Sequence, residues 1–364
     1  MKTRVLIYSV LFFLLIPAIH HQRISQAEAR SPKFSGWITY WDFDRGIASI
    51  AAQPQAWNDI FLFAASFDEN ASLIVAQKLL QNQPTIAQMA SSGIAIWLSV
   101  VNDLNVNGNT ILKDPAIIHR ILTDKKLRDH HIAELIETAH QTGATGVDID
   151  YENLWVKDRE TFTDFIKKTG QALHANGLLF SVTVQPKKGP TQSQGSGAAS
   201  WKEICPHVDR LQVMLYNQHS KRTGPGAMAT LPWIKTVMDY GTTQCSHEKL
   251  VPVLKISGMK WKPGNVRDIS FHDATRLAEE KSVTVARAPA STGSAPFFSF
   301  SSPQGKATVY FEDAKSLRQK IHSLLIQGFT QINFWSLGPH DKRLSRHLAI
   351  LKSLPPPQGF CTTR

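Results

Sequence analysis

The feature that most constrains the fold is a repeated alternation of strand-forming and helix-forming segments along most of the chain. Runs rich in β-branched and aromatic residues lie at 36–41, 59–66, 94–100, 146–153, 178–184, 209–216, 250–256 and 331–337. Helix-forming segments lie at 84–92, 124–142, 158–176, 231–240, 312–327 and 344–351. Buried strands that alternate with helices favour a parallel sheet, and eight of them predict an α/β fold, a single (β/α)₈ TIM barrel over residues 34–352.

One segment interrupts this alternation. Residues 259–311 hold a helical piece at 273–280 and several short β-rich runs. We expect them to form a small α+β insertion after the seventh strand. The proline-rich end, residues 353–364, is predicted to be unstructured.

The start of the chain has the three parts of a secretory signal. Lys2 and Arg4 precede an apolar run at 5–19, and a small-x-small sequence ends at Ala29. The pattern predicts a signal peptide at 1–29, removed on export, so that no membrane span remains. Because the apolar run is short for a spanning helix, an uncleaved anchor is the less favoured alternative. We expect a secreted or extracytoplasmic protein, in the periplasm or cell envelope.

Charge and cysteine content limit the partners. The net charge of +11 suits an anionic envelope surface, although it can equally serve solubility, and no basic run interleaved with aromatics indicates nucleic acid. Three cysteines, Cys205, Cys245 and Cys361, allow one disulfide, which the sequence does not choose, and none has metal-ligand spacing. We expect a monomer with no metal and no cofactor.

The fourth predicted strand carries a row of acids. Side chains alternate between the two faces of a strand, so Asp148, Asp150 and Glu152 share one face and apolar residues occupy the other. Neighbouring like charges raise the pKa of at least one carboxyl group. A carboxylic acid that stays protonated near neutral pH is suited to general acid catalysis of glycoside cleavage.

Two metal sites are alternative readings of this row. A calcium loop is disfavoured because Ile149 and Tyr151 stand where such a loop has polar residues. An Asp-x-Asp metal site of a nucleotide-sugar transferase remains open on the motif alone. In a barrel, functional side chains lie at the carboxyl ends of the strands. Glu152 would then lie highest in the mouth, with Asp150 and Asp148 beneath it.

Three motifs in order resemble glycoside hydrolase family 18, the chitinase family. They are Asp-x-Asp-x-Glu at 148–152, Met-Leu-Tyr-Asn at 214–217 and Phe-Trp-Ser-Leu-Gly at 334–338. The resemblance covers about residues 36–351. Residues 296–298 and 309–317 are most similar to the branch of spore-cortex and cell-wall N-acetylglucosaminidases.

The resemblance implies a retaining mechanism in which the substrate's own acetamido group assists. Glu152 would be the acid/base, and Asp150 would hold the acetamido group of the substrate. Asp148 would share charge and a proton with Asp150, and Tyr216 would stabilise the cyclic intermediate. The expected substrate is a β-linked N-acetylglucosamine polymer, peptidoglycan or chitin. The alternative is a chitinase-like sugar-binding protein without turnover, which the presence of Glu152 disfavours.

Further residues would complete the site. Met214, Asn217 and Trp335 would shape the sugar-binding floor, and Ser99 would support Asp148. Packing in the core is an equally good reading of Met214. Gln185 ends the fifth predicted strand; contact with the site is one reading, but we expect it to face the following loop.

Three positions depart from the family pattern. Thr145 stands where an Asp is usual, and we expect a structural effect only. Asn217 replaces an Asp of many members, which affects pH behaviour more than activity. Trp37 replaces a Tyr and would leave Asp148 with one hydrogen bond fewer.

Overall fold

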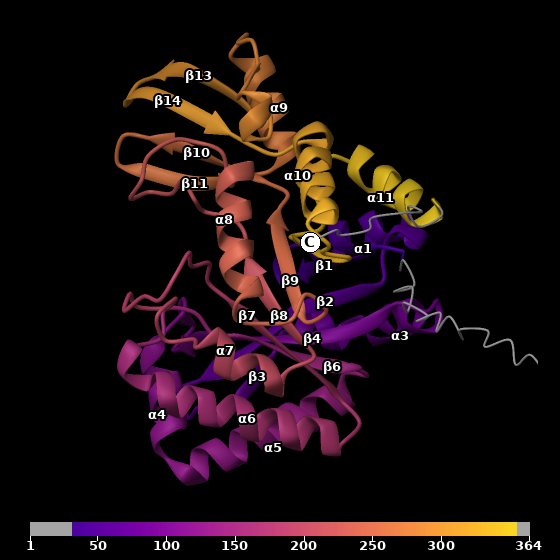
Figure 1. The fold of residues 1–364 in the computed structure, drawn as a ribbon, viewed down its shortest axis with the longest axis vertical. Coiled ribbons are helices and arrows are strands. Elements are labelled where there is room, and N and C mark those ends of the chain that lie inside the picture. The colour runs from indigo at the N-terminus through magenta and orange to yellow at the C-terminus, as the bar shows by residue number, and fades with distance from the viewer. Residues whose placement is uncertain (1–30, 355–364) are drawn as a thin grey trace, which may run out of the picture. The chain divides into compact units, whose positions relative to one another are not determined.

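The computed structural model describes residues 31–354 (Figure 1). The predicted signal peptide at 1–29 and residues 355–364 of the predicted tail lie outside this range. Among the described helices, none is long and apolar enough to cross a membrane.

Within residues 31–354, eight parallel strands close into a barrel, which confirms the predicted fold. In order around the barrel they are β1 (Lys33–Thr39), β2 (Asp59–Asp68), β4 (Ala95–Val106), β6 (Gly146–Asp150), β7 (Leu179–Val184), β8 (Arg210–Met214), β9 (Leu250–Lys255) and β15 (Gln331–Trp335). β15 pairs back onto β1 and closes the ring. Two short strands, β3 (Leu73–Val75) and β5 (Asn109–Ile111), extend the upper ends of β2 and β4 as antiparallel partners.

Helices cover the outside of this barrel. They are α1 (Phe43–Ala51), α2 (Gln77–Gln81), α3 (Gln83–Ser91), α4 (Pro115–Thr123), α5 (Lys125–Gln141), α6 (Arg159–Ala175), α7 (Trp201–Ile204), α8 (Leu231–Thr242), α10 (Ala314–Ile326) and α11 (Arg343–Ser353). α4, α5 and α6 contact one another, and Figure 1 shows them together on one side of the barrel. The main apolar core lies between the barrel strands and these helices.

The prediction missed α1, α2, α4 and α7. α4 has a clear start signal, because Asp114 caps it by accepting from the Ala116 N–H and Pro115 follows at the first helical position. Asp124 separates α4 from α5 and caps α5 through the N–H groups of Lys126 and Leu127. The helix predicted at 124–142 is therefore α5 alone, and α4 precedes it as a separate helix.

The expected α+β insertion follows β9. Its strands, in sheet order, are β11 (Asn265–Ile269), β10 (Gly258–Lys262), β14 (Gly305–Tyr310), β13 (Pro296–Ser302) and β12 (Ala286–Arg287), and α9 (Phe271–Glu280) packs with them on a separate apolar cluster. The first strand starts at Gly258, where a Cβ would lie 2.3 Å from the Tyr310 carbonyl oxygen. Lys255 of the barrel pairs with Asp268 of β11 at 2.7 Å. This ion pair joins the first hairpin of the insertion to the carboxyl end of β9.

The lower interior of the barrel is packed with aromatic rings. Trp37 stacks on Phe61 at 4.7 Å between ring centroids, and Phe61 stacks on Trp97 at 5.2 Å. Gly146 leaves room for this layer, because a Cβ there would lie 2.7 Å from the Trp97 ring. Above it, the side chains of Ser99, Thr183 and Gln212 surround Asp148.

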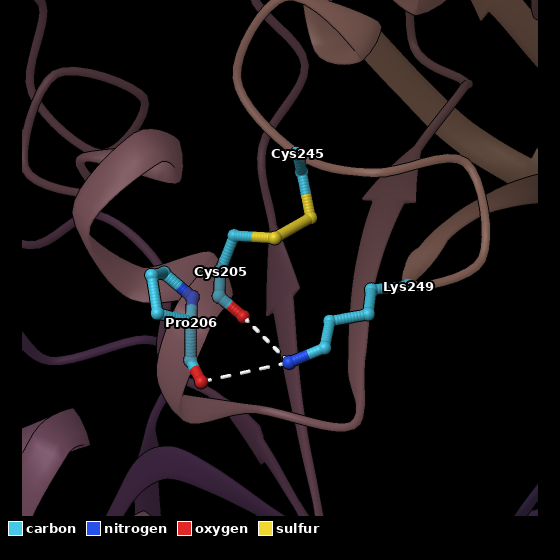
Figure 2. Close-up of a disulfide and its surroundings, with 4 residues drawn as sticks. All are labelled: Cys205, Pro206, Cys245 and Lys249. Carbon is cyan, nitrogen blue, oxygen red and sulfur yellow. Dashed lines mark hydrogen bonds between the residues drawn. A yellow bond between two sulfur atoms is a disulfide. The ribbon is translucent and has the colours of Figure 1, made fainter.

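A disulfide links Cys205, which follows α7, to Cys245, which follows α8 (Figure 2). The two Cα atoms are 5.6 Å apart, and the bond spans a sequence separation of 40 residues that includes β8. Lys249 Nζ donates to the carbonyl oxygens of Cys205 at 3.2 Å and Pro206 at 3.5 Å. Cys361 lies outside the described residues.

Candidate active site

The acidic strand is β6, and its three acids lie at increasing height in the barrel. Asp148 and Asp150 are buried, whereas the Glu152 side chain, just past the end of the strand, is 23% exposed. Tyr151 points to the other face, where its hydroxyl lies 2.7 Å from His131 Nε2 of α5. The alternation predicted for this strand is therefore confirmed.

Asp148 is held by hydrogen bonds on both carboxylate oxygens. It accepts from Ser99 Oγ at 2.8 Å, Thr183 Oγ1 at 3.0 Å and Gln212 Nε2 at 3.0 Å. Burial raises the pKa of Asp148, and these hydrogen bonds partly offset that rise. The Trp37 indole N–H donates to Ser99 Oγ at 2.9 Å and does not reach Asp148. Thr183 and Gln212 thus supply hydrogen bonds to Asp148 beyond the one expected from Ser99.

Asp150 combines burial with incomplete hydrogen bonding. Its Oδ1 atom has no hydrogen-bond partner among residues 31–354. Burial is the largest cause that raises the pKa of Asp150 to about 8, and Glu152, Asp148 and Asp103 raise it further. The pKa of Asp150 thus moves in the direction expected for this row, but desolvation contributes more than like charge. Burial thus favours the protonated form of Asp150 in the free protein.

Glu152 is fixed through its backbone and its side chain. Its N–H donates to Asn102 Oδ1 at 2.9 Å, and its carbonyl accepts from Asn102 Nδ2 at 2.9 Å. Its Oε1 lies 3.1 Å from Lys113 Nζ, and its Oε2 accepts from Gln185 Nε2 at 3.3 Å. Both carboxylate oxygens are therefore oriented by side chains from other strands and loops.

Gln185 differs from the expectation that it would face the loop. Its amide turns to Glu152 because the loop comes down over it at Gly195. Gly195 has a φ of +77°, and a Cβ there would lie 2.0 Å from Gln185 Oε1. Only glycine accommodates both the left-handed backbone and this close approach.

Aromatic rings line the site beside the acids. Trp335 ends β15, is partly buried and packs edge-on against Phe63 at 5.0 Å and Trp37 at 6.1 Å. Trp41 is 59% exposed and packs edge-on against Phe63 at 5.5 Å, which adds an exposed ring to this aromatic cluster. The sequence analysis did not single out Trp41, although it is the last residue of the first predicted strand.

The end of β8 contributes the residues of the second motif. Tyr216 is partly buried against the same aromatic cluster. Burial, followed by the charges of Asp150 and Glu152, raises the pKa of Tyr216 well above its usual range, so the phenol stays protonated as a donor. Met214 is buried but lies outside the described apolar clusters. Asn217 is exposed and has a φ of +60°.

Thr145, the remaining departure, lies just before the start of β6. Its hydroxyl donates to the Ile96 carbonyl at 2.8 Å. This is the opposite end of the strand from Glu152, so Thr145 has no direct contact with the acid.

Lys113 and Asn102 are two further site residues that the sequence analysis missed, besides Trp41, Thr183 and Gln212. Asn102 lies on the part of β4 that continues past the predicted strand end at residue 100, to Val106. Lys113 lies in the loop between β5 and α4, with no local motif to mark it. Only the fold brings them to Glu152.

Known proteins provide a comparison. A profile of the family described as "Glycosyl hydrolases family 18" matches residues 33–339. The chain is 26% identical over 307 residues to the "Cortical fragment-lytic enzyme" of Bacillus cereus, which covers 81% of this chain and 70% of that protein.

The fold is also found in solved structures. The spore cortex-lytic enzyme SleL of Bacillus cereus superposes with a TM-score of 0.76 at 22% identity, over 89% of this chain and 75% of that one. A chitinase of Chromobacterium violaceum superposes with a TM-score of 0.77 at 21% identity, over 89% and 99% of the two chains. Because the family profile spans most of the sequence and the barrel, the chain belongs to glycosyl hydrolase family 18 and is a glycosidase.

Proposed function

We propose that this glycosidase hydrolyses β-linked N-acetylglucosamine polymers, of the peptidoglycan or chitin type, with retention of the anomeric configuration. The observation that carries the proposal is the state of Asp150, which is buried beside Glu152 with one oxygen unpartnered among the described residues. A buried oxygen without a partner is costly unless a ligand satisfies it. The acetamido N–H of a bound sugar is a donor of the required kind.

The position of Asp150 argues against attack by a carboxylate. Retaining glycosidases usually set a carboxylate nucleophile about 5 Å from the acid, on the other face of the sugar ring. Asp150 comes from the same strand as Glu152 and lies below it, so both approach the sugar from one side. Asp150 is better placed to orient the acetamido group, whose carbonyl oxygen then attacks the anomeric carbon.

The remaining roles follow from this arrangement. Glu152 donates its proton to the glycosidic oxygen as that bond breaks, and the acetamido oxygen forms the new bond in a cyclic intermediate. Glu152 then removes a proton from the water that opens the ring. Asp148 shares charge and a proton with Asp150, the Tyr216 phenol donates to the intermediate, and Trp335 supports the sugar ring. Met214 and Asn217 line the floor, and Ser99 orients Asp148.

Export completes the proposal. The predicted signal peptide and the net charge of +11 suit a protein of the cell envelope. The Cys205–Cys245 bond adds support, because structural disulfides persist in oxidising compartments. The curated relative named above as a cortical fragment-lytic enzyme and the chitinase neighbour point to the two polymer types.

The test compares N-acetylated with de-N-acetylated oligosaccharides of equal length and follows the first product anomer by NMR. We expect hydrolysis only where the sugar at the cleaved bond carries an N-acetyl group, and a retained anomer. A thiazoline mimic of the cyclic intermediate should inhibit strongly, since the site stabilises that species. Equal rates on both oligomers, or an inverted anomer, would refute the mechanism. Mass analysis of products from both polymers then separates peptidoglycan from chitin.

A further inference from the structure

Lys113 places a positive charge inside the row of carboxylates. Its Nζ lies 3.1 Å from Glu152 Oε1 and 3.7 Å from Asp150 Oδ2, and 5.0 Å from the centre of the Phe63 ring. Its side chain is only 20% exposed. Among the ion pairs of residues 31–354, these two are the ones that include Asp150 or Glu152.

The chain holds Lys113 at this point by several independent contacts. Its backbone has a φ of +54°, a left-handed conformation that is unfavourable for lysine. The Lys113 N–H donates to Asp103 Oδ1 at 2.9 Å, and the next N–H, of Asp114, donates to the Asn102 carbonyl at 2.8 Å. A conformation of this kind persists where the surrounding structure fixes it.

Asn102 couples this loop to the acid. Its Nδ2 donates to the carbonyls of Asp114 at 3.1 Å and Glu152 at 2.9 Å, and its Oδ1 accepts from the Glu152 N–H. One fully buried amide therefore fixes the backbone next to Lys113 and the backbone of Glu152 relative to each other. An ordinary surface lysine has no such support.

We propose that Lys113 is a positioning residue, which aims the Glu152 carboxylate and supplies the positive charge that lets Asp150 ionise when substrate binds. This inference rests on the proposed function, because it concerns the same acetamido-binding role of Asp150. Lys113 need not touch the substrate in this role. It acts through the two carboxyl groups that do.

The charges around Asp150 explain why its ionisation depends on Lys113. Acidic groups face Asp150 from β6 (Asp148), from just beyond it (Glu152) and from β4 (Asp103), and the neutral Tyr216 phenol faces it from the end of β8. Lys113 is the cation that opposes them and lowers the pKa of Asp150. An opposite charge within about 4–6 Å typically shifts a carboxyl pKa by about 1–3 units.

The direction of the effect follows. An ionised Asp150 accepts the acetamido N–H more strongly than a protonated one, so we expect activity on the acid side to fall as the pH drops through the pKa of Asp150. Loss of Lys113 raises that pKa further. The acid limb of kcat/KM therefore moves to higher pH.

The experiment measures kcat/KM against pH for Lys113→Met and Lys113→Arg on an N-acetylated oligosaccharide. We expect the acid limb of Lys113→Met to move up by about 1–2 pH units, and that of Lys113→Arg to stay within about half a unit of wild type. Lys157→Met is the matched control, because exposed Lys157 also lies over an aromatic ring, that of Trp155 at 4.4 Å. It removes the same net charge and should leave the limb in place.

A second variant shifts the pKa of Asp150 in the opposite direction, by removing a negative charge instead of a positive one. Asp103→Asn removes an acid that raises the pKa of Asp150 but keeps an oxygen that can accept from the Lys113 N–H. Its acid limb should move to lower pH, so the inference remains testable if Lys113→Met does not fold. A loss of kcat/KM that is equal at every pH in Lys113→Met, or an unmoved limb in Asp103→Asn, would overturn the role of Lys113. The proposed function itself fails in a different experiment. In that case the wild-type enzyme would hydrolyse oligosaccharides that carry no N-acetyl group.

Discussion

Loss of the Cys205–Cys245 disulfide should lower the free energy of unfolding by about 4 kcal/mol. The bond closes a loop with a sequence separation of 40 residues. Closing a loop of that length in the unfolded chain removes conformational entropy worth about 4 kcal/mol at 25 °C. With an unfolding entropy of about 2.1 cal/mol/K per residue, this corresponds to about 6 °C in Tm for a chain of this size.

The closed loop also carries part of the candidate site. It contains β8 and the residues beyond its end, including Met214 and Tyr216. Activity should therefore be lost over the same temperature range as the fold, because β8 lies between β7 and β9 in the barrel. Below that range, the reduced enzyme should keep its kcat, since neither cysteine contacts the acids.

The measurement is urea unfolding of the oxidised and reduced wild-type protein, together with the Cys205→Ala/Cys245→Ala variant. The reduced protein isolates the crosslink, because its composition is unchanged, and Cys361→Ser controls for thiol exchange. The disulfide is first shown to be intact in the oxidised protein. If reduction then lowers the free energy of unfolding by less than about 1 kcal/mol, the loop-closure reasoning is refuted.

Three further outcomes are expected. Glu152→Gln should lower kcat by about 10²–10⁴ with an unchanged Tm, because the transferable proton is lost while the anchoring by Asn102 remains; wild-type turnover would mean that another group is the acid. Trp335→Ala should raise KM about 10-fold with a smaller effect on kcat, since a large apolar face is removed; an unchanged KM would place the sugar elsewhere. N-terminal sequencing of the exported protein should begin at or near Arg30, and a full-length chain in the membrane fraction would contradict cleavage.

The barrel could be predicted because its signals are local. Strand and helix periods alternate along the chain, and a buried parallel strand has few other arrangements available to it. The short helix α4 was missed although Asp114 caps it, because it ends at Asp124, where the predicted helix at 124–142 begins. Helix boundaries of this kind are set by single hydrogen bonds, which a periodic pattern does not reveal.

The sequence also determined the row of acids, because neighbours along one strand keep a fixed spacing whatever surrounds them. It could not determine the protonation of Asp150, since the largest contribution to its pKa is burial within the closed barrel. Nor could it choose among three cysteines, because the pairing depends on the 5.6 Å approach of two Cα atoms.

Lys113 shows most clearly what could not be predicted from the sequence. It lies in a loop after β5 and reaches Glu152 only because β4 and β6 are adjacent strands in the barrel and Asn102 binds both segments. The sequence determined which carboxyl groups stand together on β6. The tertiary structure alone decided which positive charge faces them, because charges interact through space and not along the chain.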